Sequence, residues 1–170
     1  SLHESLLRLP ATLKIEPNET YIELVVKLRK TVKARPNDLE GHLLLSRVET
    51  GLQNFLAAST ALSKAIKIKG DNATAEDFFD YSELLILAAQ GYVSPEAEDA
   101  LNQVLKRDIK FSAAHYYVGL MMAQNDRPDR AFQIWRRLLM QTPQDSPWIE
   151  PIRNQIENVA IAAGVNDFEL

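Results

Sequence analysis

Cysteine is absent from this chain of 170 residues. Its absence excludes disulfide bonds, thiolate metal sites, iron–sulfur clusters and cysteine nucleophiles together. Glycine is scarce as well, since the chain has only six and no two of them lie closer than ten positions apart. Loops that cradle phosphate groups need glycines in a cluster. Walker-type nucleotide sites and dinucleotide-binding sites are therefore excluded.

Histidine is also rare, and the three histidines are too far apart in the sequence to form a local metal motif: His3, His42 and His115. Glu96, Glu98 and Asp99 form a small acidic group. They follow Ser94-Pro95, a helix-start signal, and acidic side chains in a first helical turn stabilise the helix dipole. We therefore expect no catalytic residues, no metal site and no cofactor.

Long apolar runs are missing. The longest, residues 84–89, falls far short of the roughly 18 residues that a membrane-spanning helix needs. The chain begins with Ser1 rather than methionine, so we expect it to be a fragment or a processed form. Basic residues gather only between positions 27 and 35, where they alternate with apolar residues at helical spacing. We interpret them as the solvated face of an amphipathic helix, the alternative being a patch for anionic lipid or nucleic acid.

A nucleic-acid partner is not expected, because the chain has a net charge of −4 and lacks a recognisable nucleic-acid-binding motif. Nearly every long segment instead has helical period, with proline and glycine between the segments and no alternating β-branched runs. Ser146-Pro147, like Ser94-Pro95, predicts an N-cap followed by proline at the first helical position. The sequence therefore predicts an all-α protein of seven or eight helices.

A repeat runs through these helices. Each unit has a small residue, a larger one four positions later and an apolar one three positions after that: Ala58/Leu62/Ala65, Ala97/Leu101/Val104 and Ala131/Trp135/Leu138. The units are spaced by 39 and then 34 residues. A helix–turn–helix unit of about 34 residues with this signature is typical of the tetratricopeptide repeat. Because the small residues let two helices approach closely, we expect Ala58, Ala97 and Ala131 to be buried.

The predicted fold is thus an all-α, right-handed tetratricopeptide-repeat superhelix of helical hairpins, with three repeats and a flanking helix at each end. The predicted organisation is an N-terminal arm (1–19), a tetratricopeptide-repeat domain (20–164) and a tail (165–170). Within the domain we expect a leading helix, three repeats and a closing helix, over 20–35, 38–70, 74–110, 112–143 and 147–163.

In such a fold the first helix of each hairpin lines a concave face. Counting the same offsets from His42, Tyr81 and His115 predicts a stripe of groove residues: Leu43, Arg47, Thr50, Ser82, Ile86, Gln90, Tyr116, Leu120 and Gln124. Several are large and apolar where a solvated face would usually be charged, which favours a groove for the apolar face of an amphipathic helix. The alternative is a surface left over by packing. Arg47 is the only basic residue of the stripe, so a clamp for a C-terminal carboxylate is disfavoured.

Three strings of the sequence resemble one family of repeat proteins. They are residues 41–47 (Gly-His-Leu-Leu-Leu-Ser-Arg), residues 88–97, and residues 131–139 with the following Thr142-Pro143 and Asp145-Ser146-Pro147-Trp148. All three are similar to c-type cytochrome biogenesis proteins of the CcmI/CycH/NrfG group. The chain departs from that pattern at His42, Ser46 and Gly70, where the family usually has Trp, Gly and Pro, and these changes leave the architecture intact.

The resemblance implies a function. It implies a non-enzymatic peptide-binding chaperone or adaptor of cytochrome c maturation, which holds the C-terminal helix of apocytochrome c and delivers it to the haem-ligation complex of the membrane. It also implies a location on the periplasmic side of the bacterial inner membrane, with a membrane tether only upstream of Ser1. The alternative is a generic tetratricopeptide-repeat scaffold that binds another protein.

Overall fold

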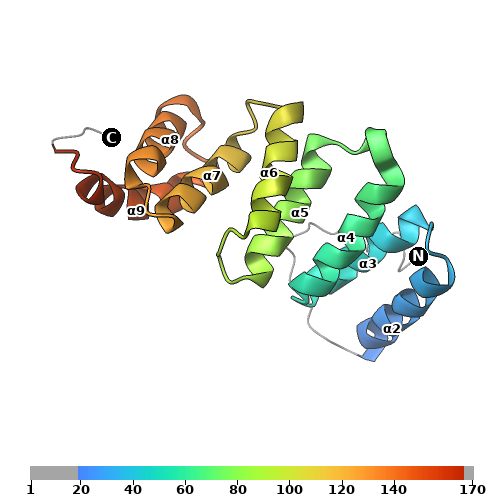
Figure 1. Cartoon of the computed structure of the whole chain (residues 1–170). Coiled ribbons are helices and arrows are strands. Elements are labelled where there is room, and N and C mark those ends of the chain that lie inside the picture. Colours follow the sequence, from blue (N-terminus) through green and yellow to red (C-terminus); the bar gives the residue numbers. More distant parts are fainter. Residues whose placement is uncertain (1–18, 167–170) are drawn as a thin grey trace. The chain divides into compact units, whose positions relative to one another are not determined.

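The computed structural model describes residues 19–166, and all regular structure in that range is helical (Figure 1). In chain order the elements are α2 (Glu19–Ala34), α3 (Leu39–Gly51), α4 (Phe55–Lys69), the short 3-10 helix η1 (Gly70–Asn72), α5 (Ala75–Ala88), α6 (Pro95–Arg107), α7 (Ser112–Gln124), α8 (Pro128–Gln141) and α9 (Ile149–Ala162). The all-α prediction is confirmed.

The helices coincide closely with the predicted segments. Helix α2 occupies the range of the leading helix and α9 that of the closing helix, while the three pairs between them occupy the predicted repeats. Of the predicted arm only Glu19 is described, and of the predicted tail only Val165 and Asn166, so the rest of both lies outside the described residues. The predicted domain bounds stay a prediction.

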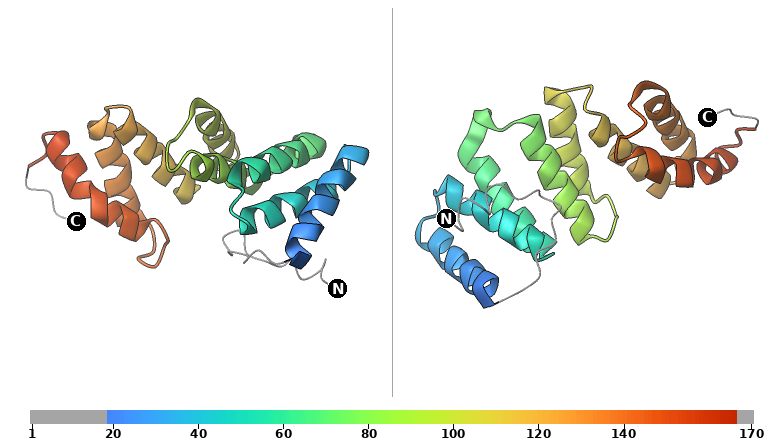
Figure 2. Two further views of the ribbon diagram at one scale, coloured as in Figure 1. Left: turned by 90° about the horizontal axis from the view of Figure 1, so that it is seen from below. Right: turned by 180° about the vertical axis from the view of Figure 1, so that it is seen from behind.

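The chain divides into two compact units, residues 1–91 and 92–170. Among the described residues, the first contains α2 to α5 and the second α6 to α9. The division falls between α5 and α6, which are the two helices of the second predicted repeat. Helix α3 packs along α4 in the first unit and α7 along α8 in the second, as both views of Figure 2 show.

Local sequence signals account for the helix starts in the first unit. Asp38 caps α3 by accepting a hydrogen bond from the backbone N–H of Gly41 at 3.0 Å. Thr74 and Asp77 form a capping box at the start of α5, each side chain accepting from the other residue's backbone N–H. These caps satisfy backbone donors that a helix cannot satisfy internally, so the starts of α3 and α5 are well defined.

The core of the first unit lies in two layers of apolar side chains. One layer packs α2 against α3, with Ala61 of α4 beside it: Val25, Leu28, Val32, Leu44, Leu45, Val48 and Ala61. The other packs α4 against α5, with Ala58, Leu62, Ala65 and Leu84 at its centre. The Ser46 hydroxyl joins α3 to α4 by donating to the Ala58 carbonyl at 3.0 Å. Small residues therefore lie at both contacts of α4: Ser46 and Ala58 where it meets α3, and Ala58 and Ala65 where it meets α5.

An ion pair between a buried carboxylate on α3 and a half-exposed arginine on α2 also joins these two helices. The Glu49 side chain is only 1% exposed, and its two oxygens accept from Arg29 Nε at 2.6 Å and from Asn54 Nδ2 at 2.8 Å. Both carboxylate oxygens are therefore paired, which removes most of the cost of burying this charge. The other basic side chains of α2 are exposed, as the amphipathic pattern predicts.

The second unit has a core of larger side chains around Trp135. The ring of Trp135 is fully buried, and its Nε1 donates to the Tyr116 carbonyl at 3.1 Å. Gly119 makes room for it, because a Cβ atom there would lie 2.6 Å from Trp135 Cδ1. Ile152, Ile156 and Ala160 of α9 close this core against Phe132, Trp135 and Leu138 of α8.

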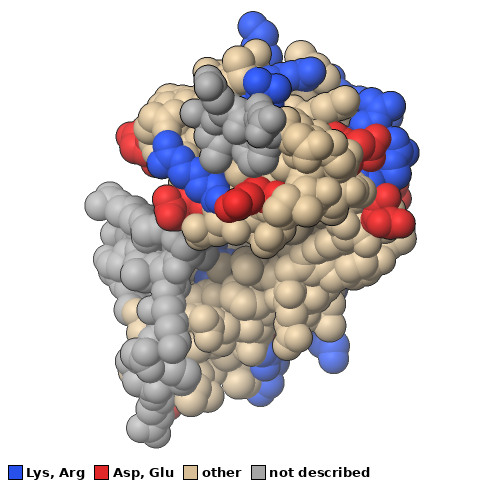
Figure 3. Space-filling view, turned by 90° about the vertical axis from the view of Figure 1, so that its left-hand side faces the viewer, with Lys and Arg blue, Asp and Glu red and all other residues tan. Residues whose placement is uncertain are grey.

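On the face shown in Figure 3, basic and acidic side chains stand next to each other, so charge of both signs is mixed there.

The repeat positions are buried where the sequence predicts. Ala58, Ala97 and Ala131 are all fully buried, which confirms that expectation. His42 and His115, each sixteen positions before the first alanine of its repeat unit, make the same contact: Nε2 of His42 donates to the Pro36 carbonyl at 2.8 Å, and Nε2 of His115 to the Ile109 carbonyl at 2.7 Å. Each ring thus ties down the loop six residues earlier, a role that the periodicity did not indicate.

Candidate functional site: a pocket between α3, α4 and α5

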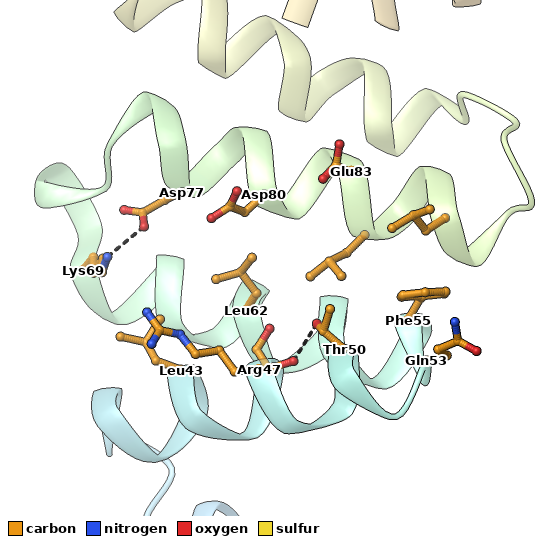
Figure 4. A pocket seen from close by; sticks show the side chains of 13 residues that line it. Leu43, Arg47, Thr50, Gln53, Phe55, Leu62, Lys69, Asp77, Asp80 and Glu83 are labelled. Carbon is orange, nitrogen blue, oxygen red and sulfur yellow. Dashed lines mark hydrogen bonds and ion pairs between the residues drawn. The ribbon is translucent and has the colours of Figure 1, made fainter. Parts of the chain in front are cut away.

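A pocket of about 420 Å³ lies in the first unit between α3, α4 and α5 (Figure 4). Helix α3 contributes Leu43, Ser46, Arg47 and Thr50 to it, the α3–α4 turn and α4 contribute Gln53, Phe55, Leu62 and Lys69, and α5 contributes Asp77, Asp80, Glu83, Leu84 and Leu87. Its volume is in the range of sites that take a small molecule or several side chains of a partner.

The pocket has an apolar floor. Leu62 and Leu84 belong to the core layer between α4 and α5, and Leu43 and Phe55 pack against the same layer from its edge. The two hydroxyl groups of the α3 wall face inward and are already committed to backbone carbonyls, Ser46 to Ala58 at 3.0 Å and Thr50 to Ser46 at 2.7 Å. The lower part of the pocket therefore offers contact area rather than unsatisfied polar atoms.

The α5 wall is acidic. Asp77, Asp80 and Glu83 are spaced by three residues, so all three come from one face of the helix (Figure 4). Asp77 is neutralised across the pocket by Lys69, at 2.8 Å between Nζ and Oδ1. The net effect of this ion pair and of the Thr74 hydrogen bonds is to lower the pKa of Asp77, although burial acts in the opposite direction.

Asp80 lies in a different environment one turn further along. Burial is the main cause that raises its pKa to about 7, and the charges of Glu76, Glu83 and Asp77 add to it. Arg47, on the opposite wall, acts in the other direction without offsetting these effects. No hydrogen bond or ion pair within the described part of the chain holds the Asp80 carboxyl. This carboxyl therefore stays costly to ionise in the empty pocket.

A second, more open hollow adjoins the pocket. The two share three lining residues, Gln53, Phe55 and Leu87. The second hollow extends along the end of the unit, where Leu56 and Leu87 are 69% and 43% exposed, to Gln90. Exposed leucines at the end of an apolar-floored pocket extend its contact area for a partner. We refer to the pocket and this hollow together as the α3–α5 groove.

The structure brings together only part of the predicted stripe. Leu43, Arg47 and Thr50 share the pocket, and Gln90 lines the adjoining hollow. Ser82 and Ile86 are buried instead, 0% and 2% exposed, so the expectation that they face a groove is wrong. The reason is geometric, because a pocket between two equivalent helices is lined by different sides of the two. Equal offsets on α3 and α5 therefore cannot both point into it.

The remaining three predicted residues lie in the second unit and pack within it. Tyr116 and Leu120 are partly buried and pack on the core around Trp135 that α9 closes. Gln124 accepts a hydrogen bond from the Val93 backbone N–H at 3.0 Å. The prediction missed the acidic wall of α5. The three-residue spacing of Asp77, Asp80 and Glu83 is visible in the sequence and is the signal that could have found it.

Antiparallel helical hairpins with small residues at their contacts, linked by short turns, define a tetratricopeptide-repeat protein. The fold is similar to the crystal structure of MamA protein, with a TM-score of 0.64 at 19% sequence identity, over 86% of this chain and 75% of that one. The family described as "Cytochrome c-type biogenesis protein H TPR domain" matches residues 13–149, and the chain belongs to this family.

Two curated relatives agree with this assignment. The chain is 29% identical over 136 residues to the cytochrome c-type biogenesis protein CycH of Bradyrhizobium diazoefficiens, and 26% identical over 147 residues to that of Rhizobium meliloti. The alignments cover 80% and 86% of this chain, but only 36% and 38% of the two relatives. The chain thus spans little more than a third of their length.

Within the described residues, no helix is both long enough and apolar enough to cross a membrane. The same residues contain no group of three or more histidine, aspartate or glutamate side chains arranged to hold a metal ion.

Proposed function

We propose that this chain is a non-enzymatic, peptide-binding module of cytochrome c maturation. In this proposal the α3–α5 groove holds the C-terminal helix of an apocytochrome c on the periplasmic side of the inner membrane, and a longer native protein presents it to the haem-ligation complex. Family membership supports the role in cytochrome c biogenesis. The apolar-floored pocket between α3, α4 and α5 is the observation that carries the binding role.

The shape and chemistry of the pocket favour a helix over an extended chain. An extended peptide that binds by its backbone needs unpaired donors and acceptors along the site, and the hydroxyl groups of Ser46 and Thr50 are already engaged. An amphipathic helix keeps its own backbone hydrogen bonds and inserts only side chains. Leu43, Phe55 and Leu62 then supply the apolar area that such side chains would bury.

The same lining favours binding over catalysis. A nucleophilic hydroxyl needs a base within hydrogen-bonding reach, whereas the Ser46 and Thr50 hydroxyls donate to backbone carbonyls. Arg47 and Lys69 are the cations of the lining, and Lys69 is paired with Asp77. The lining therefore has no nucleophile and base in the mutual geometry that acyl or phosphoryl transfer requires.

The proposal is tested by filling the pocket with a side chain that the same fold tolerates elsewhere. Leu43 and Tyr116 occupy the same repeat position, one residue after His42 and His115. We expect Leu43→Tyr to fold normally and to weaken binding of a synthetic apocytochrome C-terminal helix at least about tenfold in a calorimetric titration, an effect of the size expected at a buried anchor. Ile161→Tyr, on an exposed face of α9, is the matched control and should bind like wild type.

Two results would contradict the proposal. Equal affinity of wild type and Leu43→Tyr would place the site elsewhere. Equal affinity for unrelated amphipathic helices of the same length and charge would instead favour a generic tetratricopeptide-repeat scaffold.

A further inference from the structure

The two ends of the α3–α5 groove differ in chemistry. At one end, Leu56 and Leu87 are exposed beside Phe55, and the same hollow is also lined by Arg29, Gln53, Asn54 and Gln90, with no acidic side chain. Towards the other end, the floor formed by Leu43 and Leu62 is bordered by charged side chains from α3, α4 and α5 (Figure 4). An amphipathic helix in this groove therefore meets exposed leucines and no acidic side chain near one end, and the acidic wall of α5 near the other.

At the charged end, no cation of the pocket lining neutralises the Asp80 carboxyl. Lys69 pairs with Asp77 at 2.8 Å, so it is not available to Asp80. Arg47 faces Asp80 from α3, but it does not offset burial and the charges of Glu76, Asp77 and Glu83 on α5 itself. A cation from a ligand would be attracted to this wall, whereas a ligand carboxylate there would be repelled. The floor beside Asp80 is apolar, which suits the long aliphatic stem of a lysine or arginine.

We infer that the groove selects an amphipathic helix whose apolar stripe ends in a lysine or arginine, with that cation on Asp80 and the apolar residues running towards Leu87 and Phe55. The inference rests on the proposed function and adds the chemistry of the partner and its direction in the groove. Asp80 is then the residue that determines specificity, and the apolar end supplies contact area.

The spacing of the two features on α5 sets the spacing of the motif. Asp80 and Leu87 are seven residues apart, which is nearly two helical turns and about 10 Å along the axis. A bound helix that runs alongside α5 matches both features with a cation and a large apolar residue about seven positions apart on one face. Apolar residues three or four positions from the cation would cover Leu62 and Leu84 between them.

The test uses synthetic helices of one design. The parent probe is an 18-residue amphipathic helix with a stripe of leucines and one lysine at the end of that stripe. A second probe replaces the lysine by norleucine, which keeps the stem and removes the charge. A third moves the lysine to the middle of the stripe. Each is titrated by calorimetry into the whole chain, into Asp80→Asn, and into Asp71→Asn as a matched control, because Asp71 is an exposed aspartate of η1 outside the groove lining.

We expect the parent probe to bind the wild-type chain and Asp71→Asn about tenfold more tightly than the other two probes. Against Asp80→Asn the preference should fall to about twofold or less. Binding should also release a proton near pH 7, because a bound cation lowers the pKa of Asp80 from about 7. Affinity for the parent probe should therefore rise from pH 6 to pH 8 in wild type and stay flat in Asp80→Asn.

Different failures separate the two proposals. If all probes bind wild type equally, or if Asp80→Asn keeps the full preference for the parent probe, the inference about the cation is wrong while a helix-binding groove survives. If neither these probes nor an apocytochrome C-terminal helix binds at all, both proposals are wrong.

Discussion

The first and third hairpins of this protein share the same repeat but differ in the side chains at its inward-facing positions. In α3/α4 and in α7/α8 a histidine ring holds the preceding loop, through Pro36 and Ile109 respectively, and a fully buried alanine lies at the helix contact. The two hairpins therefore share their backbone frame. They differ in the size of the side chains between their helices, and this difference explains why the pocket lies beside the first hairpin.

Equivalent positions show the difference directly. Leu43 and Leu62 of the first hairpin correspond to Tyr116 and Trp135 of the third. The rings of Tyr116 and Trp135 stack with centroids 6.0 Å apart and an interplanar angle of 19°, and they fill the space between α7, α8 and α9. The smaller leucines leave the pocket of about 420 Å³ open. The proposed binding site therefore lies where the repeat carries leucines in place of aromatic rings.

The largest expected effect comes from emptying the filled hairpin. Trp135→Ala should destabilise the fold by about 3–5 kcal/mol, because it leaves a cavity under Tyr116 and removes the hydrogen bond to the Tyr116 carbonyl. Leu62→Ala, at the equivalent position, should cost less, about 2 kcal/mol, since Leu62 already borders a hollow. Urea denaturation followed by circular dichroism measures both. Equal costs would contradict the claim that only the third hairpin is tightly filled.

A smaller effect on stability is expected from the acidic wall of α5, where replacing Asp80 or Asp77 by asparagine should change the free energy of unfolding in opposite directions. The folded-state pKa of Asp80, about 7, lies above its ordinary value of 3.8, so the folded chain holds this proton more tightly than the unfolded chain does. Protonated Asp80 therefore favours folding, and this contribution is lost as the pH rises from about 4 to about 7. Asparagine at this position does not ionise, so Asp80→Asn avoids the destabilisation that an ionised Asp80 causes at high pH. We expect this variant to raise the free energy of unfolding by about 1–2 kcal/mol at pH 8 and by almost nothing at pH 4.

Asp77 provides the matched comparison on the same helix. Its pKa is lowered in the fold, so its contribution is present near neutral pH and is lost as the pH falls below its ordinary value of 3.8. Asp77→Asn should destabilise the fold by about 1 kcal/mol at pH 8, because it weakens the capping box with Thr74 and the ion pair with Lys69. Thermal melts of Asp80→Asn at pH 4 and pH 8, and of Asp77→Asn at pH 2 and pH 8, check the two signs. A loss of stability in Asp80→Asn at pH 8 would show that this carboxyl serves folding.

Much of the frame was predictable from the sequence. Ser94 and Pro95 mark the start of α6 as predicted, and the small residues at Ala58, Ala97 and Ala131 mark buried helix contacts, because both signals are local. The same prediction was wrong at Ser146-Pro147, because these residues lie in a turn and α9 begins later, at Ile149. The pairing of Arg29 with Glu49 was not predictable, since the 20 positions between them are bridged only by the packing of α2 on α3. Counting from His42 on α3 led to three residues that line the pocket, Leu43, Arg47 and Thr50, and their role in binding a peptide stays a prediction.

The stripe does not enter the pocket on α5, and on α7 it lies in the second unit. On α5 the offsets that worked for α3 lead to Ser82 and Ile86, which are buried, because the pocket lies on opposite sides of the two helices. On α7 Tyr116 and Leu120 are large and apolar, and both pack partly buried against the core that α9 closes. Composition alone does not distinguish an apolar face that receives a partner from one that receives the chain's own closing helix.

The central claim is that the first hairpin is open to a partner helix while the third is already filled. Backbone amide NMR during titration of the wild-type chain with an apocytochrome C-terminal helix tests this most directly. The account predicts that the largest chemical-shift changes occur in α3 around Leu43 and Arg47 and in α5 around Asp80 and Leu87, with small changes in α7 and α9. Changes concentrated on Tyr116, Leu120 and α9, with α3 and α5 unaffected, would contradict it.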